Sequence, residues 1–100
     1  MNAQTTFGTD QARRYLATLF KHFGHKVPVQ LDGDLGLIEL PFGKCRLTAD
    51  DTVLQIEVSA ETKNDLDKVA QIIVSHLERF AFRENPRIEW NQASGPTNAA

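Results

Sequence analysis

The segment from Val27 to Ser59 constrains the fold of this chain most strongly, because one pattern occurs in it four times. In each repeat apolar and polar residues alternate, as in a β-strand with one buried face. The four inward-facing sets are Val27, Val29 and Leu31; Gly36, Ile38 and Leu40; Cys45, Leu47 and Ala49; and Leu54, Ile56 and Val58. Turn-forming residues separate the repeats, and strands joined by such short turns are antiparallel. We therefore expect an antiparallel sheet with one buried face and one open face.

Two amphipathic helices are predicted, one on each side of this segment. Apolar residues recur at helical spacing from Gln11 to Phe23, after Thr9 or Asp10 as the helix cap. A longer apolar stripe runs from Asp65 to Glu84, with Ser59 or Thr62 in the capping position. Each stripe has to be buried, so both helices should lie on the apolar face of the sheet.

The two ends of the chain add short elements to this plan. The stretch from Gln4 to Phe7 suits a short edge strand, and Arg87 to Trp90 suits a last one. The small polar residues from Asn91 to Ala100 predict a disordered tail. The expected fold is a single α+β domain over residues 1–90, followed by the tail over residues 91–100. It is a two-layer sandwich in which two helices cover one face of an antiparallel, four- to six-stranded sheet, in the order (β)αββββα(β).

The composition is that of an ordinary globular domain and argues against several classes of partner. Hydrophobic residues make up 41% of the chain, charged residues 24%, and the net charge is −2. That charge gives no overall attraction to nucleic acid or anionic membrane, and no apolar run approaches the ~20 residues needed to span a bilayer. The single cysteine, Cys45, can form no internal disulfide, and the first residues do not resemble a secretory signal. We expect a cytoplasmic protein with no nucleic-acid or membrane partner.

Four residues are candidate metal ligands: His22, His25, Cys45 and His76. His22 and His76 each fall at the edge of an apolar stripe, so they would face each other if the helices pack side by side. Cys45 points toward the core by strand alternation. Such a set could hold zinc, iron or the iron of a haem. The alternative is structural, with histidines bonded to nearby carbonyls and the cysteine packed as a small apolar residue.

A polar edge of this candidate site comprises Tyr15, Arg79 and Arg83. The chain contains none of the common hydrolase, phosphate-loop, metalloprotease or dinucleotide-binding motifs, which favours a protein without catalytic activity. An enzyme using Cys45 as nucleophile and His22 or His76 as base stays an alternative. A core-facing cysteine would be poorly exposed, however, and exposure is what a reactive thiolate needs.

The open face of the sheet is a candidate dimer interface. It would carry three apolar residues and several charges of both signs. These are Leu35, Leu37 and Val53, with Lys44, Arg46 and Arg87 interleaved with Glu39, Glu57 and Glu89. We expect cross-strand charge pairs there. The apolar groups either mark a surface that a second copy of the chain covers, or are scattered single groups that need no cover.

Three segments of the chain resemble a known family. They are ARRYLATLFKHFGHK from residue 12, IELPFGKCRLTADD from residue 38, and HLERFAFRE from residue 76, followed by Trp90. Together they resemble a family of small bacterial proteins catalogued as domain of unknown function, number twenty-two eighteen, over about Gln4 to Trp90. The matching positions are Arg14, Tyr15, Leu16, His22, His25, Cys45, Arg46, His76, Glu78, Arg79, Phe80 and Phe82. Related sequences often carry a cysteine and a tryptophan in the first helix, where this chain has Phe20 and Phe23.

The resemblance implies a context more than an activity. Some members of the family are associated with siderophore-interacting flavin reductases, as neighbours or fusions, so the resemblance implies a role in iron or siderophore handling and such a reductase as partner. Three hypotheses follow. The chain is an accessory or ligand-binding module linked to iron or siderophore metabolism, a structural domain that forms homodimers without catalysis, or an enzyme using Cys45 with a histidine base.

Overall fold

The four alternating segments form consecutive strands in the computed structural model, which describes residues 1–81, 84 and 90–92. The strands are β2 (Val29–Asp32), β3 (Leu35–Leu40), β4 (Gly43–Ala49) and β5 (Val53–Ser59). All neighbours among them are antiparallel, and Cys45 lies between Ile38 of β3 and Val58 of β5. The predicted inward residues of β4 and β5 are all buried. The predicted α+β fold and antiparallel sheet are confirmed.

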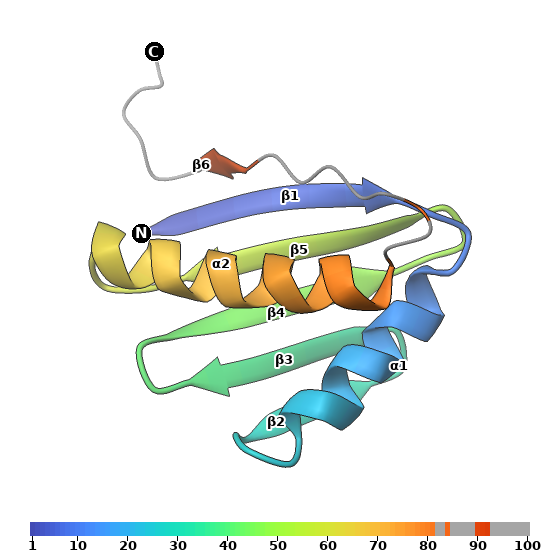
Figure 1. The fold of residues 1–100 in the computed structure, drawn as a ribbon, viewed down its shortest axis with the longest axis horizontal. Helices are drawn as coiled ribbons and strands as arrows, with labels where there is room; N and C mark the ends of the chain where they lie inside the picture. The colour runs from blue at the N-terminus through green and yellow to red at the C-terminus, as the bar shows by residue number, and fades with distance from the viewer. Residues whose placement is uncertain (82–83, 85–89, 93–100) are drawn as a thin grey trace.

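The first strand is longer and more central than the predicted edge strand at Gln4 to Phe7. β1 (Asn2–Gly8) pairs antiparallel with β5 along its whole length. The sheet has six strands in the order β2-β3-β4-β5-β1-β6, where β6 is Asn91–Gln92 (Figure 1). Ala3, Thr5 and Phe7 are buried, so the alternating burial begins before Gln4, where the predicted strand starts.

The end of the chain departs from the prediction in one respect. The sequence predicts the last strand at Arg87 to Trp90, but residues 87–89 lie outside the described part of the structure. The strand that is described, β6, consists of two residues predicted to belong to the tail, and it pairs with Ala3 and Gln4 of β1. Trp90, just before it, is half-buried against the core.

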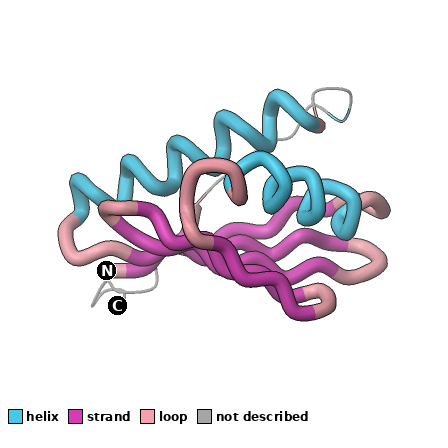
Figure 2. Tube along the Cα trace, turned by 90° about the horizontal axis from the view of Figure 1, so that it is seen from below, coloured by secondary structure: helices cyan, strands magenta, loops and turns pink. Residues whose placement is uncertain are grey.

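Two helices lie on one face of this sheet and leave the other face open, as Figure 2 shows. They are α1 (Ala12–Phe23) and α2 (Lys63–Phe80). Thr62 caps α2 as predicted, because its side-chain oxygen accepts a hydrogen bond of 3.1 Å from the backbone N–H of Asp65. The cap residue of α1 is Gln11, and Thr9 instead accepts a hydrogen bond from the N–H of Gln11. α2 ends at Phe80, although its apolar stripe continues to the buried Ala81.

The contact between Phe20 and Gly36 places α1 directly on β3. A Cβ atom at Gly36 would lie 2.1 Å from Cζ of Phe20, so only glycine leaves room for the ring. At the N-terminal end of α1, Arg13 forms ion pairs with Asp34 and Asp51 in the turns that precede β3 and β5. These contacts fix the path of α1 across the sheet and therefore the position of its last turn.

Leu31 is the one predicted inward residue of the sheet that the structure leaves exposed, with 53% of its surface accessible. It lies opposite Gly36, the residue that Phe20 covers. β2 is the outermost strand on that side, so no further strand flanks Leu31. In the described residues, no helix has the length and apolar character to cross a membrane.

Candidate functional site

The structure brings His22 and His76 side by side. His22 is the penultimate residue of α1, and His76 lies near the C-terminal end of α2. Their ring centroids are 4.6 Å apart and the ring planes are inclined by 52°. Both residues occupy the edge of an apolar stripe, and α1 and α2 pack against each other as well as against the sheet. We call these two residues the histidine pair.

Two phenylalanines complete an aromatic cluster around the histidine pair. The ring of Phe23 lies 4.7 Å from that of His76 and meets His22 edge-on at 5.6 Å. Phe80 lies 5.9 Å from His22 and 6.3 Å from His76. These rings restrict the orientations open to both imidazoles, so the pair is held in place by packing.

One hydrogen bond determines which nitrogen of His76 is available. Its Nδ1 lies 2.7 Å from the carbonyl oxygen of Ile72, one helical turn earlier. A carbonyl oxygen can only accept, so Nδ1 carries the proton and the neutral ring keeps a lone pair on Nε2. Histidines that bind metals commonly donate their second nitrogen to a carbonyl in this way, which fixes the tautomer and the ring orientation.

The charges near His22 are positive. Burial lowers the pKa of His22 most, and repulsion from His76, Lys26, Arg79 and His25 lowers it further. The neutral imidazole is therefore favoured over the imidazolium, and the neutral form is the one that binds metals. The surroundings of the pair would also attract an anion.

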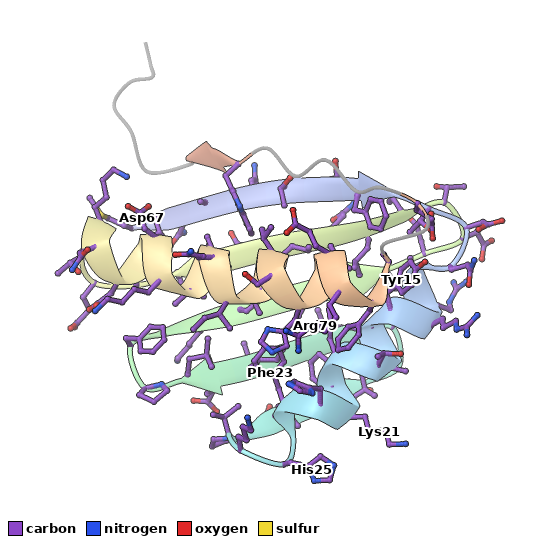
Figure 3. The ribbon with its side chains drawn as sticks, viewed as in Figure 1. Tyr15, Lys21, Phe23, His25, Asp67 and Arg79 are labelled. Carbon is purple, nitrogen blue, oxygen red and sulfur yellow. The ribbon has the colours of Figure 1, made fainter. Side chains whose placement is uncertain are left out.

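His25 and Cys45 are not placed with the histidine pair. His25 is exposed beyond the end of α1, and Figure 3 shows it at the outer end of that helix. Cys45 is completely buried in the sheet, and burial raises the pKa of its thiol well above the ordinary range. Within residues 1–81, 84 and 90–92, no three or more His, Cys, Asp or Glu side chains are grouped as a metal site. Cys45 is also poorly placed as a nucleophile, because a thiolate has to be reachable.

The residues of the predicted polar edge have different surroundings in the structure. Tyr15 is buried, stacks on Phe7 at 6.0 Å, and donates a hydrogen bond to the carboxylate of Glu84. That bond raises the pKa of Tyr15 to about 12. Figure 3 shows Tyr15 beside the end of α2. Arg79 is exposed, and its positive charge contributes to the lowered pKa of His22. Arg83 lies outside the described residues.

Glu84 is not among the residues that the sequence singles out. The signal that could have found it is the tyrosine on the buried stripe of α1, since a buried tyrosine hydroxyl usually needs a hydrogen-bond partner.

A pocket of about 340 Å³ adjoins His76, between α2 and the turn that joins β3 and β4. Its lining consists of Phe42, Lys68, Gln71, Ile72, Ser75 and His76. The sequence does not predict this pocket, because it forms only where the turn between β3 and β4 brings Phe42 against α2. Its size is that of a small-molecule site.

The open face of the sheet carries charges of both signs in register. Lys44 of β4 lies opposite Glu39 of β3, and Arg46 lies opposite Glu57 of β5. A shallow, mostly polar hollow of about 310 Å³ lies over β1, β4 and β5, and Arg46 and Glu57 both line it. These four of the expected cross-strand charge neighbours are therefore present, although no ion pair between them is found among the described residues. Arg87 and Glu89, the other two, lie outside the described residues.

Comparisons with known proteins show what this chain is similar to. The family described as "Uncharacterized protein conserved in bacteria (DUF2218)" matches residues 4–91. The NMR structure of PA4090 from Pseudomonas aeruginosa is similar to this chain, with a TM-score of 0.78 and 28% sequence identity. The match covers 90% of this chain and 94% of that one. A comparison with curated proteins gave no match.

Proposed function

The chain belongs to the DUF2218 family of uncharacterised bacterial proteins, and we propose that it is a cytoplasmic small-molecule binding module of iron metabolism. In this proposal His22 and His76 together bind a transition-metal ion, and a chelating ligand fills the remaining coordination positions. The family resemblance supplies the link to iron and siderophores. The histidine pair supplies the chemistry.

The distance between the two rings carries the proposal. Two imidazoles bound to one ion at about 2.0–2.1 Å, with an angle between about 90° and 110° at the metal, have centroids roughly 4.5–5.2 Å apart. The 4.6 Å between His22 and His76 falls in this range. A haem iron bound from opposite sides would need centroids about 6 Å apart, so the pair suits a non-haem ion better.

A chelating ligand is part of the proposal because two side chains do not complete a coordination sphere. Zinc in structural sites takes four ligands, and no third protein ligand joins the pair in the described part of the chain. A chelator with two or more donor atoms would supply the rest. His22 and His76 are half-buried, which leaves a bound chelate within reach of a partner. A siderophore-interacting reductase is the partner that the family resemblance suggests.

Calorimetric titration with the nitrilotriacetate complexes of zinc and of ferric iron tests this function. The wild-type protein should bind both, and His22→Ala or His76→Ala should weaken binding at least about tenfold, since each removes one of the two protein ligands. His25→Ala is the matched control, because His25 is exposed beyond α1 and has the smallest effect of the neighbouring charges on the pKa of His22, so it should change binding little. If the wild-type protein takes up neither metal complex, the proposal is wrong.

We also propose that the open sheet face joins two copies of the chain, because that face presents both signs of charge in register. Lys44 and Arg46 of one copy can meet Glu39 and Glu57 of the other. The molecule extends 34 × 27 Å in the plane of the sheet (Figure 1), enough for the roughly 800 Å² per partner of a standard interface. Arg46→Glu should then give a monomer by light scattering. A wild-type protein that is monomeric at high concentration would rule out this second role.

A further inference from the structure

The pocket beside His76 has an ordered set of side chains along its length. Lys68, Ile72 and His76 follow one another at four-residue intervals on α2, so they share one face of the helix. At a rise of 1.5 Å per residue, the first and last are about 12 Å apart along the helix axis. Phe42 forms the opposite wall. The pocket is therefore elongated, with an ammonium group at one end and an imidazole at the other.

The middle of the pocket is apolar and its rim is polar. Phe42 and Ile72 are half-buried and pack against the core, so their exposed faces are fixed. Ser75 and Gln71 add hydrogen-bonding groups at the rim. A flat apolar group would fit between the phenyl ring and the isoleucine, and two polar side chains could orient it.

The charges at both ends of the pocket are positive. At the far end, Lys68 forms a long, partly exposed ion pair with Asp65, with 3.9 Å between Nζ and the nearest carboxylate oxygen. That distance is too long for a hydrogen bond, so the N–H groups of the ammonium can still donate to an anionic ligand. At the metal end, the positive charges of Lys26 and Arg79 lower the pKa of His22 by repulsion. An uncoordinated cation would be repelled here, whereas a chelate with negative charge would be attracted.

We infer that this pocket binds the chelating ligand, and that the ligand is an anion with a flat apolar body between a chelating head and a second anionic group. The chelating head lies at His76 with the metal, the body lies between Phe42 and Ile72, and the second anionic group lies at Lys68. This inference rests on the proposed function, and it adds the chemical class of the ligand.

The zinc complex of 8-hydroxyquinoline-5-sulfonate is a suitable probe. It chelates at one end of a flat two-ring body and carries a sulfonate at the other. Zinc nitrilotriacetate is the comparison probe, because it is an anionic chelate without a flat body. The wild-type protein should bind the quinoline complex at least about tenfold more tightly than the nitrilotriacetate complex, as judged by fluorescence and calorimetry.

Three variants separate the pocket from the histidine pair. Lys68→Ala should weaken the quinoline complex about tenfold and change nitrilotriacetate binding little. Ser75→Trp should block the quinoline complex, since Ser75 is exposed and its replacement fills the pocket without disturbing the core. Lys63→Ala is the matched control, because Lys63 is on the same helix, bonds to Asp67 and does not line the pocket.

The outcomes distinguish this inference from the proposed function. Equal binding of the quinoline complex by wild type, Lys68→Ala and Ser75→Trp would overturn the inference about the pocket. The function would still stand if His76→Ala abolished binding of both complexes. If the wild-type protein bound neither complex, the inference and the proposed function would both be wrong.

Discussion

Replacing Gly36 with alanine would add a methyl group that overlaps the ring of Phe20. The new Cβ atom would lie 2.1 Å from Cζ and 2.4 Å from Cε1, whereas ordinary contacts between such atoms begin near 3.4 Å. The ring therefore has to move by more than an ångström. Only 5% of the surface of Phe20 is exposed, so the ring has nowhere to go without displacing α1 or its neighbours.

The destabilisation caused by overpacking is partly offset by a smaller stabilisation that acts through the unfolded chain. Overpacking a well-filled core costs about 1–3 kcal/mol, whereas replacing glycine with alanine restricts the unfolded chain and stabilises by about 0.4–1 kcal/mol. We expect a net loss on the order of 1–2 kcal/mol in the free energy of unfolding. For a domain of this size, that loss lowers Tm by roughly 4–15 °C.

Urea and thermal unfolding followed by circular dichroism measure this change. Gly8→Ala is the matched control, since Gly8 ends β1 and nothing lies within 4 Å of the position that its new methyl group would take. It should be neutral or slightly stabilising. Phe20→Leu should reduce the cost of Gly36→Ala when the two are combined. If Gly36→Ala were as stable as wild type, Phe20 would not lie on Gly36, and the placement of α1 over β3 would be refuted.

Three further predictions concern single side chains. Tyr15 is the only tyrosine, and its hydroxyl should titrate at pH about 12 in the native protein, as followed by ultraviolet absorbance. The stability that its bond to Glu84 contributes is therefore full below pH ~10, the pKa of an unfolded tyrosine, and is lost as the pH rises through the native pKa. Glu84→Gln should bring the pKa of Tyr15 back toward 10. Leu77→Ala should cost about 2–5 kcal/mol in denaturant unfolding, because Leu77 is fully buried, and a surface-like cost would contradict its place in the core. Cys45 should resist iodoacetamide in the native protein and react once the chain is unfolded; rapid native labelling would disprove its burial.

The parts of the fold that could be predicted depend on local patterns. β3, β4 and β5 each carry an inward-facing set at every second residue and are joined by recognisable turns, so their pairing follows from adjacent residues. The neighbouring positions of His22 and His76 followed from the same kind of reasoning, since each lies at the edge of a stripe that has to face the sheet.

The features that could not be predicted depend on contacts between distant segments. Leu31 alternates like its neighbours, but its exposure depends on which strand ends the sheet. The pocket depends on Phe42 reaching α2 across the fold, and Tyr15 finds its partner 69 residues away. No pattern within one element specifies such contacts. For the same reason, the sequence prediction grouped His25 and Cys45 with the histidine pair on residue type alone, and the structure does not place them together.

The place of β1 in the sheet has a consequence for the order of assembly. β1 is synthesised first, yet its neighbour β5 follows only after α1 and three other strands, and Phe7 pairs with Leu54. The hairpins from β2 to β5 can form from nearby residues, whereas the β1–β5 pairing closes a long loop and should come late in folding. Until then β5 presents a free edge, which is open to pairing with other chains. Pulse-labelled hydrogen exchange should therefore protect β3 and β4 before β1, and slow docking of β1 would be the stage at which this protein is most prone to aggregate.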